Sequence, residues 1–275
     1  MELTVFNDRV YELVDPKSPF VQWDTGFVFV EGPIYHDGVY HFTDFKVDKI
    51  YRYENGVTTL VHDHSDFSIG LVYDKVKDRI LRCTRERRAI TDMDDRVIVG
   101  HYKGVPINGS NDIVVDSKGR IYFSDPLSRV IEGEQIGHSS VFMYDEETGE
   151  MEMLESEMTR PNGLAFTPDE KGLYIIDSNT YSVYLMDLAT RKRELFIRQD
   201  TSMGSGGPDG MCVDKEGNLY VTGPGGIWLI GADAVPLGII RTPERAANLC
   251  FDDTGLFITA TSSIYHVDTK IPSAI

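Results

Sequence analysis

The 275-residue sequence lacks the features that mark nucleic-acid-binding, membrane-spanning and secreted proteins. It has 27 Lys and Arg against 44 Asp and Glu, and its formal net charge is −17. This balance excludes a partner bound mainly through its phosphates, because such binding needs clustered cations that displace counterions. No stretch approaches the roughly 18 apolar residues of a membrane helix, and the first residues have neither the basic start nor the apolar run of a signal peptide. We therefore expect a cytoplasmic protein that binds neither nucleic acid nor membrane.

Cysteine is scarce as well. The three cysteines, Cys83, Cys212 and Cys250, are an odd number, lie far apart and stand beside apolar residues. We expect them to be reduced core residues rather than disulfides or metal ligands. A helical apolar period sustained over about a dozen residues is also missing, so helices should be few.

The sequence does contain a sixfold internal repeat. Each copy has a polar or small residue, a Gly or near equivalent, three largely apolar residues, a turn and a second apolar strand. The copies begin at Glu31, Ile69, Asn111, Asn162, Asp209 and Ala247, 38 to 51 residues apart. This spacing matches the blade period of a propeller with four strands per blade. It predicts one all-β domain over residues 1–275, a six-bladed β-propeller with four-stranded antiparallel blades, whose first 30 residues close the ring with the last blade.

The residue that opens each repeat suggests a site on the propeller axis. Four of the six carry a carboxylate or amide oxygen: Glu31, Asn111, Asn162 and Asp209. Because the first strand of each blade lines the central channel, these side chains should converge. Such oxygens form a hard-ligand cage suited to one divalent cation such as Ca²⁺, Mg²⁺ or Mn²⁺. The alternative is that they only hydrogen-bond the backbone where the strands begin.

Four motifs resemble the family that contains gluconolactonase, regucalcin (SMP-30) and luciferin-regenerating enzyme, which is related to the calcium-dependent diisopropyl fluorophosphatase propellers. They are Val30-Glu-Gly-Pro, Ser110-Asn-Asp, Arg160-Pro-Asn-Gly-Leu-Ala-Phe and Gly207-Pro-Asp-Gly-Met-Cys-Val-Asp. The resemblance spans about residues 25 to 268. It implies that Glu31, Asn162 and Asp209 are metal ligands, and that Asn111 is a ligand or a substrate contact. It also implies hydrolysis of lactones or esters, usually sugar lactones.

The sequence departs from this family at the expected substrate site. Members that bind open sugar acids tend to carry Arg two residues before the equivalent of Asn111, where this chain has Gly109. The aromatic pair common after the Ser-Asp-Pro motif is replaced by Leu127-Ser128. We therefore expect a smaller or less polar lactone than gluconolactone. Residues 127–137 are long enough to form a loop over the channel mouth, where specificity would lie.

Two further groups of residues are candidate substrate contacts. Asp44, Asp125 and Asp177 end the second strands of their blades, which antiparallel pairing returns to the face of the cage. They are either substrate contacts or turn caps, and Asp177 is the one selected. In the basic run of residues 85–88, Arg88 is the candidate to face the channel mouth and bind an anionic group; a solvated surface charge is the alternative.

These residues lead to one principal functional hypothesis, a metal-dependent lactonase. The ion would polarise the lactone carbonyl, and water would be the nucleophile. Asp209 is the preferred general base and Glu31 the second choice. We expect Ca²⁺ first, with Mg²⁺, Mn²⁺, Zn²⁺ or Fe²⁺ as alternatives. A phosphotriesterase-like hydrolase on the same ion and a non-catalytic binding propeller with a structural ion remain alternative functions.

Overall fold

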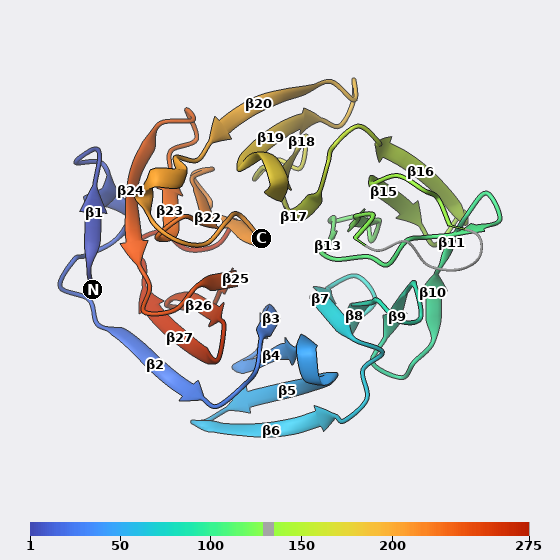
Figure 1. Cartoon of the computed structure of the whole chain (residues 1–275), viewed down its shortest axis with the longest axis horizontal. Coiled ribbons are helices and arrows are strands. Elements are labelled where there is room, and N and C mark those ends of the chain that lie inside the picture. Colours follow the sequence, from blue (N-terminus) through green and yellow to red (C-terminus); the bar gives the residue numbers. More distant parts are fainter. Residues whose placement is uncertain (129–134, 275) are drawn as a thin grey trace.

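The computed structural model describes residues 1–128 and 135–274, and Figure 1 shows six small sheets arranged in a ring around a central axis. Blade one contains β3 (Val30–His36), β4 (Val39–Asp44), β5 (Lys49–Glu54) and β6 (Val57–His62). Blade two contains β7 (Ser68–Asp74), β8 (Arg79–Thr84), β9 (Ala89–Asp92) and β10 (Val97–Val99). Blade three contains β13 (Ile113–Val115), β14 (Ile121–Asp125), β15 (Ser140–Asp145) and β16 (Glu150–Glu155).

The second half of the ring repeats this arrangement. Blade four contains β17 (Pro161–Phe166), β18 (Gly172–Asp177), β19 (Ser182–Asp187) and β20 (Arg193–Arg198). Blade five contains β21 (Met211–Val213), β22 (Leu219–Gly223), β23 (Gly226–Ile230) and β24 (Pro236–Arg241). Blade six contains β25 (Ala246–Phe251), β26 (Gly255–Ala260) and β27 (Ser263–Asp268). The predicted all-β, six-bladed propeller is confirmed.

The N-terminal residues close the ring. Strand β2 (Phe20–Thr25) pairs with β27 and completes blade six, as predicted. Trp23 on β2 stacks on His266 of blade six, with ring centroids 4.7 Å apart, and on Tyr53 of blade one at 5.1 Å. Strand β1 (Leu3–Val5) instead pairs with β24 and makes blade five five-stranded, which the sequence did not predict.

Elements outside the blades are short. They are the helix α1 (Val10–Leu13), the 3₁₀ turns η1 (Phe45–Val47), η2 (Ser178–Thr180) and η3 (Thr201–Met203), and the hairpin β11 (His101–Tyr102) and β12 (Val105–Pro106). Helices are therefore few among the described residues, as the absence of a helical period predicted. Within those residues, no helix has the length and apolarity needed to cross a membrane.

The core lies between the blades, where each twisted sheet packs against the next. Tyr122 of blade three meets Phe166 of blade four edge to face, with ring centroids 5.0 Å apart, and both rings are buried. Tyr220 and Phe251 repeat this contact between blades five and six at 5.1 Å. The three cysteines are free thiols; Cys83 is buried in the core, whereas Cys212 and Cys250 are only partly covered.

Hydrogen bonds between inner strands set the spacing around the axis. The backbone N–H of Gly70, Gly163 and Gly210 donates to the carbonyl of Asn111, Asp209 and Ala247 on the next blade, each over 2.9 Å. A Cβ atom at Gly163 would lie 2.5 Å from the Asp209 carbonyl, so only glycine permits this approach. Since the acceptors belong to the residues that open the repeats, these bonds hold the predicted cage positions at one level of the channel.

Candidate functional site

The structure brings three of the four predicted cage residues into direct or electrostatic contact. Asn162 in β17 donates from Nδ2 to Oδ1 of Asp209, just before β21, over 2.6 Å. Glu31 in β3 is 4% exposed, and its carboxylate interacts electrostatically with that of Asp209. Asn111 stands at the equivalent backbone level in blade three. No described residue hydrogen-bonds its side-chain amide, so that oxygen is available to a ligand.

Burial and mutual repulsion govern the charges of the two acids. Burial raises the pKa of Glu31 well above its usual value, and the negative charges of Asp209 and Asp112 raise it further, whereas the Gly32 N–H and the Asn248 amide lower it. Burial also raises the pKa of Asp209, opposed chiefly by the charge of Arg245. Two desolvated carboxylates held close together favour a cation between them.

The donor set fits a hard divalent ion. Two carboxylates and two amide oxygens are the ligand types that Ca²⁺ and Mg²⁺ prefer. In residues 1–128 and 135–274, no three His, Cys, Asp or Glu side chains gather as a metal cluster, so this site depends on its asparagines. The ligand assignment itself stays a prediction.

Ser178 orients one of these amides, and sequence reasoning did not identify it. Its Oγ accepts from Asn162 Nδ2 over 3.0 Å and donates to the Pro208 carbonyl over 2.7 Å. With both Nδ2 hydrogens directed to Ser178 and Asp209, Asn162 presents its Oδ1 as the remaining polar atom. The only signal in the sequence was the position of Ser178 directly after the second strand of blade four.

The three aspartates at the ends of second strands have one shared role. Asp44 accepts from the N–H of residues 28 and 29, and Asp125 from those of residues 108 and 109. Asp177 accepts from the Thr159 N–H and hydroxyl and from the Arg160 N–H, over 2.8–3.1 Å. All three are buried. These contacts support the turn-cap interpretation, in place of the substrate contact selected for Asp177, because its oxygens are already used by the backbone before Asn162.

The arginine run in blade two also differs from the sequence expectation. Arg88, in a left-handed conformation with φ of 55°, donates to the carbonyls of Pro106 and Ile107 over 3.0 and 2.6 Å. These bonds tie it to the backbone that leads into blade three, so they favour a structural role over the anion contact predicted for it.

Arg85 fills the space beside Gly109. A Cβ atom at Gly109 would lie 3.3 Å from Arg85 Cγ. The Arg85 guanidinium lies 5.5 Å from the ring centroid of Phe45 and donates to the Ser128 hydroxyl. The missing side chain at position 109 is thus partly replaced by an arginine from the neighbouring blade. Within the loop predicted over the mouth, residues 129–134 lie outside the described residues.

A second polar layer lies below the cage. The position after each cage residue is Gly in four blades, but Asp112 and Asn248 in the other two. Asn248 Nδ2 donates to Glu31 Oε2 over 3.2 Å, and Asp112 accepts from the Leu164 N–H over 3.1 Å. Burial raises the pKa of Asp112 to about 7.

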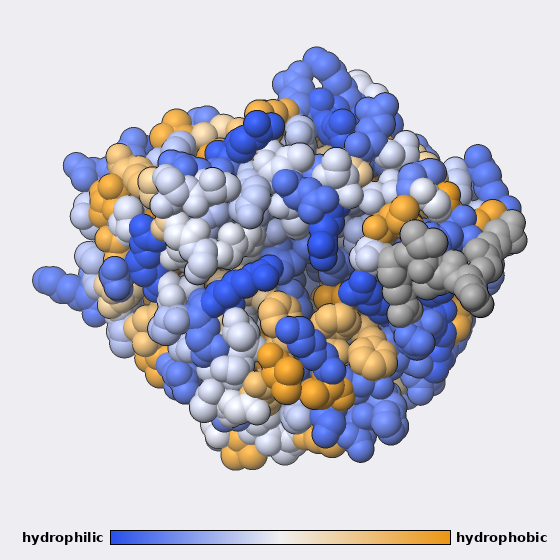
Figure 2. All heavy atoms as spheres, in the orientation of Figure 1, coloured by the Kyte–Doolittle hydropathy of each residue, from blue (hydrophilic) through white to orange (hydrophobic). Residues whose placement is uncertain are grey.

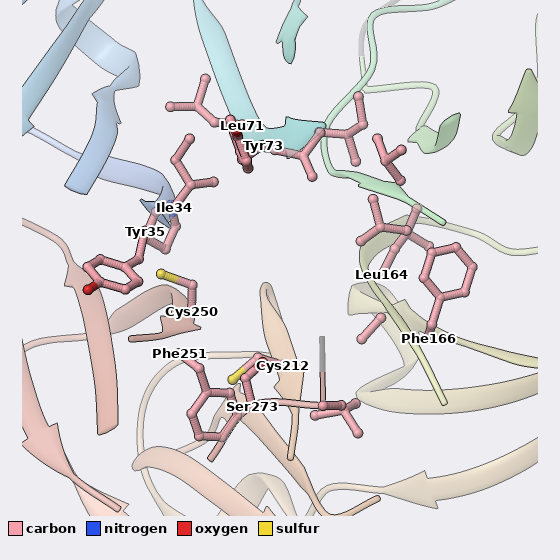
Figure 3. A pocket seen from close by; sticks show the side chains of 18 of the residues that line it. Ile34, Tyr35, Leu71, Tyr73, Leu164, Phe166, Cys212, Cys250, Phe251 and Ser273 are labelled. Atoms are coloured by element: carbon pink, nitrogen blue, oxygen red, sulfur yellow. The ribbon is translucent and has the colours of Figure 1, made fainter. Parts of the chain in front are cut away.

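The opposite end of the channel is a separate, mainly apolar cavity of about 940 Å³. Ile34, Leu71, Phe166 and Phe251 line it, and the side chains of Cys212 and Cys250 lie side by side at one part of its wall (Figure 3). Asp112 and Asn248 belong to its inner end, whereas the four cage residues do not line it. We infer that the cage is reached from the other face. Figure 2 shows a central hollow, bordered by hydrophilic residues and, over blades one and two, by an apolar patch.

Comparison with known proteins identifies the family. The model described as the SMP-30/Gluconolactonase/LRE-like region matches residues 29–262. Gluconolactonase of Zymomonas mobilis is 36% identical over 193 residues. These residues cover 63% of this chain and 54% of that protein, so the chain spans about half the length of this curated relative.

The structure of the Xanthomonas campestris gluconolactonase XC5397 superposes with a TM-score of 0.90 at 24% identity, covering 98% of this chain and 95% of that one. A regucalcin of Agrobacterium tumefaciens, described as a calcium-binding protein, superposes with a TM-score of 0.74 at 18% identity, covering 94% and 98%. The match over residues 29–262 shows that this chain belongs to the SMP-30/gluconolactonase/LRE-like family.

Proposed function

We propose that this protein is a metal-dependent lactonase that opens a small cyclic ester with water. The observation that carries the proposal is a pair of acids at the axis of the propeller, Glu31, which is buried, and Asp209, which is 14% exposed and whose charge raises the pKa of Glu31. The lactonase activity named for the Zymomonas relative supports the same reaction class.

The resident cofactor is one divalent cation held by Glu31, Asn111, Asn162 and Asp209. Ca²⁺ is the first candidate because the ligands are all oxygen and because the similar regucalcin is described as calcium-binding. Mg²⁺, Mn²⁺, Zn²⁺ and Fe²⁺ are the alternatives. When bound, the ion supplies Lewis acidity to the lactone carbonyl and stabilises the negative charge that develops on its oxygen.

Asp209 is the preferred general base. Its Oδ1 accepts from Asn162 and its Oδ2 from Arg245 over 3.1 Å, and these contacts oppose the rise that burial causes in its pKa. Its side chain is 14% exposed, so the carboxylate form is able to accept a proton from a water at the channel mouth. Glu31 is the second choice, because burial keeps its pKa higher and it is nearly inaccessible.

The two asparagines position rather than exchange protons. The Asn162 amide is fixed by Ser178 and Asp209, so it contributes an oriented neutral oxygen. Asn111 contributes another oxygen, as a ligand or as a contact to the substrate. Neutral ligands leave the ion more electron-withdrawing than carboxylates would.

The test is hydrolysis of a panel of lactones, followed by acid release at constant pH. Turnover should vanish on chelation and return when Ca²⁺ is added. A phosphotriester such as paraoxon in the same assay separates lactonase from phosphotriesterase activity. If metal binds tightly and neither substrate class turns over, the binding-propeller hypothesis replaces this one.

A further inference from the structure

The repeat positions two residues before the cage differ between the two sides of the channel mouth. In blade order they are Phe29, Phe67, Gly109, Arg160, Gly207 and Arg245. Blades one and two thus present aromatic rings at this level, whereas blades four and six present arginines. The two arginines flank blade five, which carries Asp209 and has only a glycine at the same position.

Arg245 reaches the cage directly. Its Nη2 lies 3.1 Å from Asp209 Oδ2, and its guanidinium lies 5.9 Å from the ring centroid of Phe29. The side chain is nevertheless 47% exposed. It therefore lies at the mouth of the channel, with one side against the cage and the other open to solvent.

Arg160 stands just before β17 in blade four, on the other side of blade five from Arg245. Its backbone is held at both polar atoms, since its N–H donates to Asp177 and its carbonyl accepts from the Ser178 N–H, both over 3.0 Å. Its side chain is exposed, and among the described residues none accepts a hydrogen bond from its guanidinium. Asn162, two residues after Arg160, donates to Asp209 over 2.6 Å, so the Arg160 backbone lies close to the strand contact that carries this carboxylate.

Once an ion is bound, the cage carboxylates no longer balance the charges of these two guanidiniums. The carboxylates of Glu31 and Asp209 together balance one divalent cation, so the two arginines add positive charge beside a site that is then neutral. Two cations beside a metal are stabilised by an anion that bridges them, and a guanidinium matches the geometry of a carboxylate.

We propose that Arg160 and Arg245 bind a carboxylate group of the substrate, and that the preferred substrate is a lactone that carries a free carboxylate and few hydroxyl groups. The apolar part of the ring would lie toward Phe29 and Phe67. They belong to blades one and two, the blades over which Figure 2 shows an apolar patch. This inference rests on the proposed lactonase function. Gly109 led to the expectation of a lactone smaller or less polar than gluconolactone. The inference keeps the smaller size and replaces the lower polarity by a negative charge on the substrate.

The reaction balances without a further reactant. The oxygen of water bonds to the acyl carbon, the ring C–O bond breaks, and the former ring oxygen takes one proton as a hydroxyl. The other proton of water goes to solvent at neutral pH. The product is a hydroxy dicarboxylate, of which one carboxylate stays on the arginines.

The experiment compares two substrates that differ in one charge: a γ-butyrolactone bearing a carboxylate and the same lactone with that group converted to its methylamide. The parent protein should prefer the carboxylate, and R160Q and R245Q should each reduce the ratio of the two kcat/KM values by roughly 10- to 100-fold. R96Q, which changes an arginine 71% exposed on the outer blade two, is the matched control and should keep the ratio.

A second readout does not depend on turnover. Calorimetry should show that the hydroxy dicarboxylate product binds to the calcium-loaded parent and binds at least tenfold more weakly to both variants, whose calcium affinity is measured in parallel. Equal turnover of both lactones by the parent would overturn the inference and leave the lactonase proposal intact. Binding of the dicarboxylate with no turnover of any lactone would keep the anion site and reject the lactonase. Loss of calcium binding in R245Q would assign Arg245 to the cage and overturn its role in substrate recognition.

Discussion

Asn162 and Asp209 belong to neighbouring blades and are joined at the axis by a 2.6 Å hydrogen bond from Nδ2 to Oδ1. Because Ser178 takes the other amide hydrogen, the bond fixes which atom of Asn162 is left for a ligand. The same bond stabilises the ionised form of Asp209. One interblade contact thus orients a neutral and an anionic member of the predicted ligand set together.

Replacing Asn162 by Asp separates charge from geometry. The variant keeps an oxygen at this position, but places a second carboxylate beside Asp209, where only a cation relieves the repulsion. We expect the variant to bind Ca²⁺ as tightly as the parent or up to about tenfold tighter. Its kcat should fall by about tenfold, because added ligand charge lowers the Lewis acidity of the ion toward the substrate carbonyl. Calorimetric affinity and steady-state kinetics check both. Outright loss of the ion would require a different ligand set.

Replacing Asp209 by Ala should remove metal binding and activity without unfolding the propeller. The change deletes both a predicted ligand and the preferred base, so turnover should fall by at least about 10³-fold. D37N is the matched control, since Asp37 is 88% exposed and its left-handed backbone suits Asn. A stoichiometric ion and unchanged turnover in D209A would refute the site assignment.

Removal of the Ser178 hydroxyl tests the orientation of Asn162. S178A deletes the acceptor of one amide hydrogen and should weaken Ca²⁺ binding by roughly tenfold, as loss of such supporting contacts commonly does. The exposed Ser156, on the outer edge of blade three, supplies the control S156A. Should both variants bind Ca²⁺ as the parent does, Ser178 has no part in holding the ligand.

The cap at Asp177 should matter for stability. D177N replaces an oxygen that accepts from backbone and hydroxyl donors by an NH₂ group, which leaves buried donors unpaired. We expect a loss of about 2–4 kcal/mol in the free energy of unfolding, measured by denaturant titration. D63N removes a carboxylate that is 65% exposed and should change stability by less than about 0.5 kcal/mol. Equal effects of the two changes would exclude the capping role.

The half-buried histidine of blade one, His41, should make stability depend on pH. Burial lowers the pKa of His41 to about 4, with a smaller contribution from Arg52, and its Nδ1 has no hydrogen-bond partner. The His41 imidazole is therefore protonated below about pH 6.5 in the unfolded chain, but only at a lower pH in the folded chain. The contribution of neutral His41 to the free energy of unfolding is fully present above about pH 6.5. It is lost as the pH falls toward 4, and the loss is at most about 3 kcal/mol.

Substitution isolates this contribution from other titrating groups. H41Q should lose less stability than the parent between pH 7 and pH 4.5 in parallel denaturant titrations. H64Q, at a site where the side chain is 90% exposed, should follow the parent. Parallel curves for H41Q and the parent would mean that His41 titrates normally in the folded protein.

The blades and the axial positions were predictable because local chemistry specifies them. Alternating apolar residues, glycine turns and a regular period define each hairpin, and six copies leave only the propeller as a way to bury their faces. The cage residues stood out because the repeat fixes their place on the inner strands, whatever their contacts. The closing strand β2 followed from the same requirement for a fourth strand in blade six.

Side-chain direction across blades was decided only by the tertiary structure. Arg85 and Arg88 are three residues apart, and the left-handed backbone at Arg88 turns its guanidinium to the carbonyls before blade three while Arg85 lies along Gly109. Asp177 and Ser178 are neighbours, yet one caps backbone amides and the other orients Asn162.

Arg160 and Arg245 were both visible in the sequence as members of one repeat position, 85 residues apart. That they stand in the two blades on either side of the blade that carries Asp209 depends on which blades are neighbours in the closed ring. Sequence periodicity determines the positions along each blade. Contacts between blades depend on ring closure and packing, which no single repeat encodes.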